Sequence, residues 1–457
     1  MANRVHPAVI GSQVRRFLVG GAQVWILFAL LLGASRLVGF VREAVIAYLF
    51  GATRATDSYV AATALPELLA GMLLGGLLGY AVIPAIVKLE SADDLAGAAR
   101  LLGASVVQVF LWSAVAAFIG MAFAGPLIHL ISPGLQGRDR AQAELMLRIT
   151  SPAVIFFAFG GLATAILNTR GRFLPSPIGM LAGNLAGIVV LLTSARLGIA
   201  VAAYGYLATA IVTAIVPWAT VFSRLSLTIR PTLWSPEARA VMAMGGVAAL
   251  VTGAPYVRHL IERGMASTLR PGDLASLGFA TRVVLFVAAA IAVPIGTVVF
   301  PKLAAHVVDT NPGEFGRIIR NSLVSSLLIA FAATMVLVPF SSEIVRLLFQ
   351  HGAFQASGTL VTSAILRFYA LGLIAMVANE ILIRALFVMG RWLEVLAVLA
   401  FSLSVNVGVN IWLIRTLGVQ GLALGASLGL SLSCLLLAAL LKRAYADWMN
   451  RKEVLLG

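Results

Sequence analysis

Three arginines lie in stretches of the sequence that are otherwise apolar. Arg36 and Arg42 belong to the segment GASRLVGFVREAV, which begins at Gly33 and lies between VWILFALLL and VIAYLF, and Arg282 lies in a later apolar run. A guanidinium group is permanently charged and planar, and its N–H donors match the oxygens of phosphate groups. Acidic residues that would neutralise these three arginines are scarce in the sequence, so we expect the arginines to form an anion-binding site.

Arg42 is followed directly by Glu43. Neighbouring residues of an α-helix point to different sides, so we expect Glu43 to orient Arg42 without neutralising it. Arg36 and Arg42 are six residues apart, which places them roughly 120° apart around an ideal helix. They share no narrow helix face, although Gly33 and Gly39 allow the helix to bend.

A second set of charged residues lies in the apolar run that ends near residue 264. Arg258 and Glu262 are four residues apart, so they share a helix face and can form an ion pair. His259 and Arg263 share the neighbouring face. We include Arg258, Glu262 and Arg263 among the residues of the anion site. For Arg258 and Glu262 the alternative is a structural ion pair that only permits membrane insertion.

The apolar runs contain other polar and charged residues. Asn406 and Asn410 are one helical turn apart and are candidates for a cation site, although such residues also form hydrogen bonds between membrane helices. Glu67 follows Pro66 at a position where a helix can kink, and the sequence assigns it no role. Arg384 lies near a predicted helix end, where its long side chain can reach the interface.

The composition is that of an integral membrane protein. Of 457 residues, 60% are hydrophobic and 11% are charged, against about 25% charged residues in a typical soluble domain. The net charge of +15 is spread along the chain, which argues against nucleic-acid binding. One cysteine and five scattered histidines predict neither a disulfide nor a metal centre.

Apolar runs of about 20 residues have the length that crosses a bilayer. They predict an all-α polytopic protein with twelve membrane helices, at about 24–50, 57–87, 98–122, 147–167, 174–195, 201–222, 238–264, 274–301, 318–340, 359–386, 393–414 and 419–441. The two tails and the segments after even-numbered helices carry most of the Lys and Arg residues, which predicts that both termini are cytoplasmic. The charged run after the first apolar stretch argues against a cleaved signal peptide.

The two halves of the sequence resemble each other. VIPAIVKL, with Pro84, corresponds to VFPKLAAH, with Pro301, at an offset of 301 − 84 = 217 residues. Four more pairs of short motifs occur in the same order in both halves. Six helices per half give both halves the same orientation, as in transporters that bind substrate between two parallel repeats. We expect a cytoplasmic tail at 1–23, lobes at 24–222 and 238–441, a cytoplasmic linker at 223–237 and a second tail at 442–457.

The energy source is constrained by what the sequence lacks. None of the four lysines follows the glycine of a nucleotide-binding P-loop motif. We therefore expect no nucleotide and no bound cofactor, with transport driven by a coupling cation or by the membrane potential.

The segment SRLVGFVREAVIAYLFGATRATDSYVAATALPELL, residues 35–69, resembles the first two helices of the MurJ (MviN-like) lipid II flippases. These belong to the multidrug/oligosaccharidyl-lipid/polysaccharide exporter superfamily. Weaker matches are SPGLQG, ILNTRGRFLPSP, ATRVVLF followed by FPKL, LLFQHGAF and LGVQGLAL. The resemblance implies two six-helix lobes around a central cationic cavity, in the bacterial cytoplasmic (inner) membrane.

The resemblance also implies a function in cell-wall (peptidoglycan) biosynthesis. Members move an undecaprenyl-pyrophosphate-linked sugar from the cytoplasmic to the outer leaflet by alternating access, among proteins of cell-envelope synthesis. Their cavity arginines bind the pyrophosphate, and the resemblance places these arginines at Arg36, Arg42 and Arg282. The family's acidic residue beside the second arginine corresponds to Glu43, and the aspartate that opens the second helix corresponds to Asp57.

The sequence departs from the family in two places. The charged motif expected midway along the second helix is replaced by LLAGMLLGGLLGYAVIP, and twelve helices are predicted where typical members have fourteen. A flippase for an exopolysaccharide or O-antigen repeat unit therefore remains an alternative. A drug or metabolite antiporter would favour acidic cavity residues, and a glycan polymerase or ligase would need larger outer loops. We expect a transporter and no enzyme.

Overall fold

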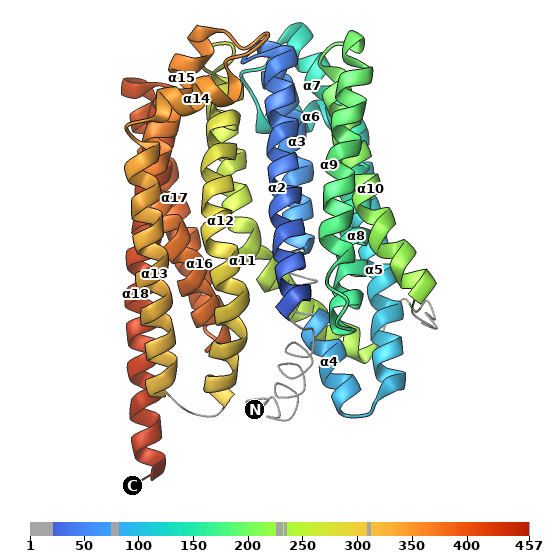
Figure 1. The fold of residues 1–457 in the computed structure, drawn as a ribbon, viewed down its shortest axis with the longest axis vertical. Coiled ribbons are helices and arrows are strands. Elements are labelled where there is room, and N and C mark those ends of the chain that lie inside the picture. Colours follow the sequence, from blue (N-terminus) through green and yellow to red (C-terminus); the bar gives the residue numbers. More distant parts are fainter. Residues whose placement is uncertain (1–21, 75–81, 225–231, 233–234, 309–311, 457) are drawn as a thin grey trace. The chain divides into compact units, whose positions relative to one another are not determined.

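The structure is a computed structural model, and it describes residues 22–74, 82–224, 232, 235–308 and 312–456 (Figure 1). These residues form helices joined by short connections. The helices are α2 (Ala22–Phe50), α3 (Arg54–Gly71), α4 (Ile83–Ser91), α5 (Leu95–Ala122), α6 (Ala124–Ile131), α7 (Gly137–Thr150), α8 (Ala153–Thr169), α9 (Pro175–Thr193), the short 3₁₀ helix η2 (Ala195–Leu197), α10 (Ala200–Arg224), α11 (Pro236–Ser267), α12 (Asp273–Val308), α13 (Pro312–Leu337), α14 (Ser341–Phe349), α15 (Ala356–Leu371), α16 (Leu373–Val388), α17 (Trp392–Leu417) and α18 (Val419–Leu456).

The predicted spans coincide with these helices. Three of them overlap a pair of α-helices. The span 57–87 overlaps α3 and α4, with 75–81 outside the described residues, 147–167 overlaps the end of α7 and most of α8, and 359–386 overlaps α15 and α16. By length and hydropathy, eight helices in the described part of the chain qualify as membrane spans, and the bent pair α15–α16 gives a ninth. The chain is therefore an all-α, multi-pass membrane protein, while the total of twelve spans stays a prediction.

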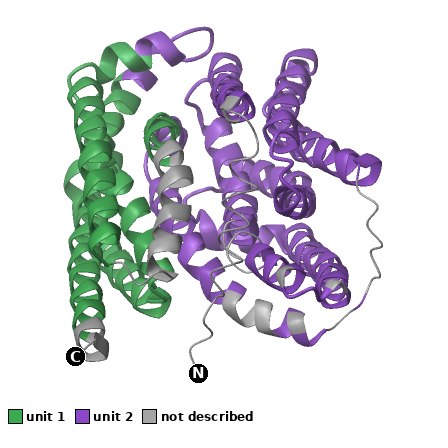
Figure 2. Ribbon diagram, turned by 60° about the horizontal axis from the view of Figure 1, so that its bottom comes forward, with its two compact units in different colours: residues 1–19, 280–345, 360–457 green, residues 20–279, 346–359 purple. Residues whose placement is uncertain are grey.

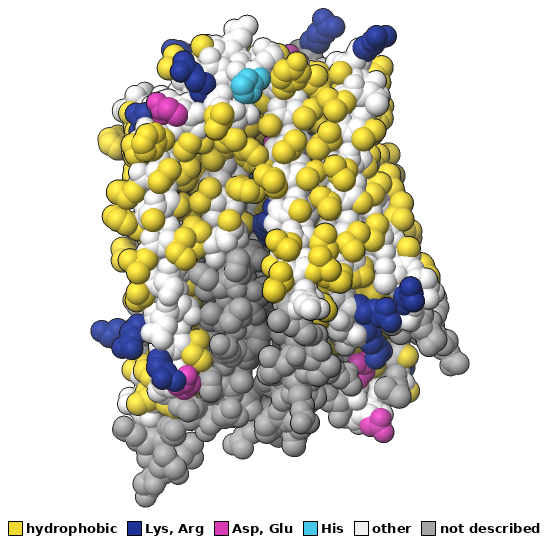
Figure 3. Space-filling model, viewed as in Figure 1, with side chains coloured by type: hydrophobic (Ala, Val, Ile, Leu, Met, Phe, Trp, Pro, Cys, Tyr) yellow, Lys and Arg dark blue, Asp and Glu magenta, His cyan; other side chains and the backbone are white. Residues whose placement is uncertain are grey.

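The surface agrees with a lipid environment. Large apolar side chains such as Leu30, Phe118 and Phe222 are more than 60% exposed. On the face shown in Figure 3, hydrophobic side chains cover the lengths of the helices, and charged side chains gather toward helix ends. Helices satisfy their own backbone hydrogen bonds, which is why they can cross a hydrocarbon layer that offers no partners.

Several helices begin at residues with capping side chains. Thr53 accepts a hydrogen bond from the backbone N–H of Thr56 at the start of α3. Asp94 caps α5 and Ser235 caps α11 in the same way, and Pro236 follows Ser235 at the first helical position. Such side chains satisfy N–H groups that have no partner inside the helix.

The bend of 44° between α15 and α16 occurs at Gly372. The Gly372 N–H bonds to the carbonyl of Tyr369 instead of Phe368, which leaves the Phe368 carbonyl without its helical partner. The Ser427 hydroxyl of α18 donates to that carbonyl at 2.7 Å. A neighbouring helix thus satisfies the group that the bend releases, as buried membrane helices require.

The chain divides into two compact units (Figure 2). In the described residues, one unit comprises 22–279 and 346–359, and the other comprises 280–345 and 360–456. In the first, α2 packs on α9, α9 on α10, and α3 on both α7 and α11. In the second, α18 packs on α16 and α17, and α13 packs on α16. The expected lobes at 24–222 and 238–441 and their relation as repeats stay predictions.

A stripe of glycines allows α9 and α10 to approach closely. Gly179, Gly183 and Gly187 recur every four residues along one face of α9. A Cβ atom at Gly183 would lie only 2.6 Å from the carbonyl oxygen of Thr209 on α10. Small residues at this spacing are typical of tightly packed membrane helices. The contact fixes Thr209, which reaches the first candidate residue of the site.

Candidate functional site

Arg42 lies on α2 and is held by two side chains. Its Nη2 atom donates to Glu43 Oε1 at 2.8 Å, and its Nη1 atom donates to Thr209 Oγ1 at 3.1 Å. Arg42 is 9% exposed and Glu43 is 7% exposed. The expectation that Glu43 would leave Arg42 without a neutralising partner was therefore wrong. Both side chains are long enough to meet although their Cα atoms point in different directions. The predicted orienting role of Glu43 agrees with this geometry.

Arg36 lies on the same helix and differs from Arg42. Like the Nε of Arg42, its Nε atom is buried and makes no hydrogen bond in the described part of the chain, but Arg36 also has no ion pair there. The Tyr256 side chain of α11 lies within electrostatic range of the guanidinium. A buried donor without a partner costs free energy, so a ligand with oxygen acceptors would stabilise Arg36.

The charged cluster on α11 is paired as the spacing predicted. Arg258 Nη1 donates to Glu262 Oε1 at 3.0 Å, and the other carboxylate oxygen of Glu262 lies 3.4 Å from His259 Nδ1. Arg258 is 7% exposed and Glu262 is 1% exposed. The predicted ion pair is confirmed, and its part in anion binding stays a prediction.

Arg263 is paired with a residue from another helix. Its Nη2 atom donates to Glu67 Oε2 of α3 at 2.8 Å. The side chains of Arg263 and Glu67 are 11% and 16% exposed. The sequence indicated Arg263 as a site residue but not Glu67, although an acidic residue within an apolar run is itself a signal of a buried partner.

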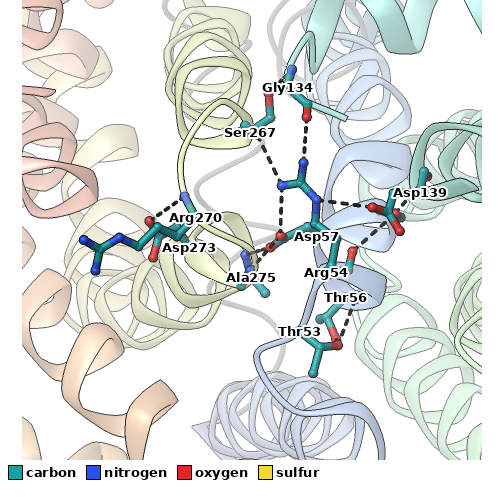
Figure 4. A network of polar contacts seen from close by, with 12 residues as sticks. Thr53, Arg54, Thr56, Asp57, Gly134, Asp139, Ser267, Arg270, Asp273 and Ala275 are labelled. Atoms are coloured by element: carbon teal, nitrogen blue, oxygen red, sulfur yellow. Dashed lines mark hydrogen bonds and ion pairs between the residues drawn. The ribbon is translucent and has the colours of Figure 1, made fainter. Parts of the chain in front are cut away.

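Asp57 lies at the start of α3 and has both carboxylate oxygens engaged (Figure 4). They accept the backbone N–H groups of Gly272 at 2.8 Å and Ala275 at 2.7 Å, at the start of α12. Asp57 is fully buried. An aspartate in this position caps a helix and interacts favourably with its dipole. The geometry is that of a structural cap, and the predicted contact of Asp57 with substrate stays a prediction.

Arg54 connects Asp57 to two further segments (Figure 4). Its guanidinium donates to the carbonyl oxygens of Gly134 at 2.6 Å and Ser267 at 3.4 Å, and it lies 3.4 Å from an oxygen of Asp139 and 3.6 Å from one of Asp57. Arg54 was not among the site residues predicted from the sequence. Asp57 is three residues from Arg54, but the two carbonyl partners are 80 and 213 residues away along the chain, so no local pattern could have identified those two.

Arg282 and the two asparagines lie in the other compact unit. Arg282 is half-buried on α12, and its predicted convergence with Arg36 and Arg42 on one cavity stays a prediction. Asn410 Nδ2 donates to Asn406 Oδ1 at 3.3 Å, and both residues are buried. They lie on one face of α17, against Gly425 and Gly429 of α18. Their predicted role as a cation site stays a prediction.

Most cations of the described candidate site thus have an acid partner. Arg42 pairs with Glu43, Arg258 with Glu262 and Arg263 with Glu67. Binding of an anion by these paired arginines stays a prediction. Among the described residues, no group of three or more His, Cys, Asp or Glu side chains is placed to hold a metal ion.

Comparisons with known proteins agree with this description. The family model described as "Lipid II flippase MurJ" matches residues 46–454. The lipid II flippase MurJ of Burkholderia cenocepacia is 24% identical over 88% of this chain and 80% of its own length. A solved structure of lipid II flippase MurJ in an inward closed conformation has a TM-score of 0.79 at 22% identity, covering 94% of this chain and 91% of the other.

A multidrug resistance transporter of the MATE family, in an inward-facing conformation, has a TM-score of 0.71 at 16% identity. It covers 98% of this chain and 99% of its own. These likenesses show the fold shared by the two groups of transporters. The relatives are named as flippases, which are transporters and not enzymes. Because the family model matches most of the chain, this protein belongs to the MurJ family of lipid II flippases.

Proposed function

We propose that this protein moves an undecaprenyl-pyrophosphate-linked glycan from the cytoplasmic to the outer leaflet by alternating access. Arg36, Arg42 and Arg282 bind the pyrophosphate, and Glu43 orients Arg42. Both termini are cytoplasmic, and a coupling cation or the membrane potential drives the cycle. The substrate is supplied by proteins of cell-envelope synthesis, with which the flippase works.

The observation that supports this proposal most directly is the contrast between Arg36 and Arg42. The Nη atoms of Arg42 are held by Thr209 and Glu43, whereas Arg36 has no hydrogen bond or ion pair within the described chain. The Nε atoms of both arginines are buried without a hydrogen-bond partner there. Two guanidinium groups on one helix, one oriented and one still able to accept a ligand, fit a group with several anionic oxygens. A pyrophosphate is such a group.

The test is complementation of a bacterial strain depleted of its own lipid II flippase. We expect the wild-type chain to restore growth and Arg36→Ala or Arg42→Ala to fail, with each variant present in the membrane at wild-type levels. Normal growth with the triple variant Arg36→Ala, Arg42→Ala, Arg282→Ala would refute the assignment of the substrate site.

The second candidate cargo is an exopolysaccharide or O-antigen repeat unit on the same lipid carrier. One observation favours it: the ring of Tyr256 lies so close to Gly71 that a Cβ there would be 2.8 Å from its Cδ2 atom. A charged side chain, which the family carries in this region of the second helix, does not fit beside that ring. Flipping of fluorescent lipid II and of a lipid-linked repeat unit, measured side by side in proteoliposomes, distinguishes the two cargoes.

A further inference from the structure

The ion pair of Glu67 with Arg263 joins α3 to α11. The two charged groups meet at 2.8 Å, and each side chain is less than a fifth exposed. Charges in membrane helices are costly unless they are paired. Glu67 therefore supplies the negative charge that Arg263 requires.

This pair differs from the other pairs of the candidate site in its geometry. Arg42 and Glu43 lie on one helix, as do Arg258 and Glu262, so each of those pairs moves as a unit. Glu67 and Arg263 belong to helices 196 residues apart in the chain. Exchange of this carboxylate for another anion therefore removes a link between two helices.

Glu67 and Arg263 lie near Tyr256, the residue of α11 that interacts with Arg36. Tyr256 is seven residues before Arg263, which is two turns or about 10 Å along α11. Its ring packs against Gly71, one turn after Glu67 on α3, and its side chain lies within electrostatic range of Arg36. An anionic group that binds Arg36 is thus on the same side of α11 as Arg263.

We infer that Glu67 is an internal counter-anion, which the diphosphate of the transported lipid displaces from Arg263. This inference rests on the proposed function. The carboxylate and the phosphate oxygens compete for the same guanidinium, and the group that binds it decides whether α3 and α11 stay linked. Glu67 is in this view a positioning residue that sets the affinity for the anion.

The experiment measures equilibrium binding of two probes to the full chain in nanodiscs. Inorganic pyrophosphate presents the anion alone, and farnesyl diphosphate presents it on an isoprenoid chain. We expect Glu67→Gln to bind farnesyl diphosphate roughly tenfold more tightly, because the neutral amide no longer offers Arg263 a competing negative charge. Arg263→Gln should bind it roughly tenfold more weakly.

Glu67→Asp separates competition from simple charge. Aspartate keeps the negative charge but withdraws it by about 1.5 Å, the length of one carbon–carbon bond, so its contact with Arg263 is lost. Competition predicts that Glu67→Asp also binds more tightly, whereas a long-range charge effect predicts wild-type affinity. The matched control is Glu90→Gln, which breaks the 2.7 Å pair of Glu90 with Arg170 between α4 and the turn after α8. Its affinity should stay within about twofold of wild type.

The outcomes separate this inference from the proposed function. Tighter binding in both Glu67 variants supports it, whether the effect extends to pyrophosphate or requires the isoprenoid. Wild-type affinity in Glu67→Asp overturns it, and so does unchanged affinity in Glu67→Gln, while weaker binding in Arg42→Ala keeps the proposed function. A wild-type protein that binds neither probe contradicts both.

If Glu67→Gln fails to fold because Arg263 is left unpaired, the double variant Glu67→Gln, Arg263→Gln replaces it. If the diphosphate displaces Glu67 from Arg263, this double variant should bind farnesyl diphosphate as weakly as Arg263→Gln does. Wild-type affinity of the double variant would overturn the inference.

Discussion

The carboxylate of Asp57 accepts the backbone N–H of Gly272 at 2.8 Å, so that the start of α3 caps the start of α12. The second carboxylate oxygen accepts the N–H of Ala275. A cap is usually supplied by the residue just before the helix, whereas here it comes from more than 200 residues away. The link therefore holds two distant segments of the chain together as well as ending a helix.

Removing this cap should destabilise the protein. We expect Asp57→Ala to lower the free energy of unfolding by about 2 kcal/mol, the upper range for a lost cap. Asp57→Asn keeps one acceptor oxygen and should lose about half as much. Thermal melting in detergent measures both. Asp94→Ala is the comparison, because Asp94 caps its own helix through one bond to Gly97. A melting temperature of Asp57→Ala equal to wild type would show that the cap contributes nothing.

Arg54 should hold the segments around Gly134 and Ser267 against α3. Arg54→Ala removes hydrogen bonds to both carbonyl oxygens and the ion pairs with Asp57 and Asp139. We expect hydrogen–deuterium exchange in residues 132–139 and 264–275 to become at least several-fold faster, because these bonds protect that region from opening. Arg317→Ala is the control, since Arg317 pairs with Glu314 within α13. Equal exchange in Arg54→Ala and wild type would contradict this role.

The packing of α9 on α10 should depend on Gly183. Gly183→Ala adds a methyl group 2.6 Å from the Thr209 carbonyl oxygen, and overpacking of this kind costs about 1–3 kcal/mol. Gly408 on α17 has open space around its missing side chain. Gly408→Ala should therefore keep or slightly raise the melting temperature, because alanine is the better helix former. If both variants melt alike, close packing at Gly183 is not a source of stability.

The predicted topology has a direct test by cysteine labelling. Suitable positions are exposed and outside tight glycine contacts: Gln136 and Ser357 on the predicted outer side, Arg172 and Arg443 on the predicted cytoplasmic side. Gly134 and Gly352 are unsuitable, because a Cβ would meet the backbone of Ser267 and of Tyr48. We expect a membrane-impermeant reagent to label Gln136→Cys and Ser357→Cys in intact spheroplasts, and the other two only after lysis. Labelling of all four in intact spheroplasts would refute the topology.

Much of the fold and part of the site could be predicted from the sequence. Apolar runs of bilayer length must form helices, because lipid offers backbone groups no partners, and each predicted span coincides with helical segments. The pair of Arg258 with Glu262 followed from helical spacing alone. Glu67 and Arg54 were missed as partners because their contacts join segments far apart in the chain. The pair of Arg42 with Glu43 was missed because backbone direction does not limit two long side chains.

Arg42 provides the most direct test of anion binding. We expect anion binding to depend on both the charge and the orientation of its guanidinium. Thr209 orients the guanidinium by accepting a hydrogen bond of 3.1 Å from it. We expect Arg42→Ala to abolish flipping and Arg42→Lys to keep part of it, because lysine retains the charge but lacks the planar fork. Thr209→Val keeps the shape of the side chain and removes the acceptor, so flipping should fall by roughly three- to tenfold, the value of one hydrogen bond. Glu43→Gln retains a hydrogen-bond acceptor for Arg42 and should be milder than Arg42→Ala. The measurement is flipping of a fluorescent polyprenyl-pyrophosphate glycan in proteoliposomes, with the amount of inserted protein determined for each variant. Wild-type flipping by Thr209→Val and Arg42→Lys together would show that a positive charge is sufficient at this position and that its orientation is irrelevant.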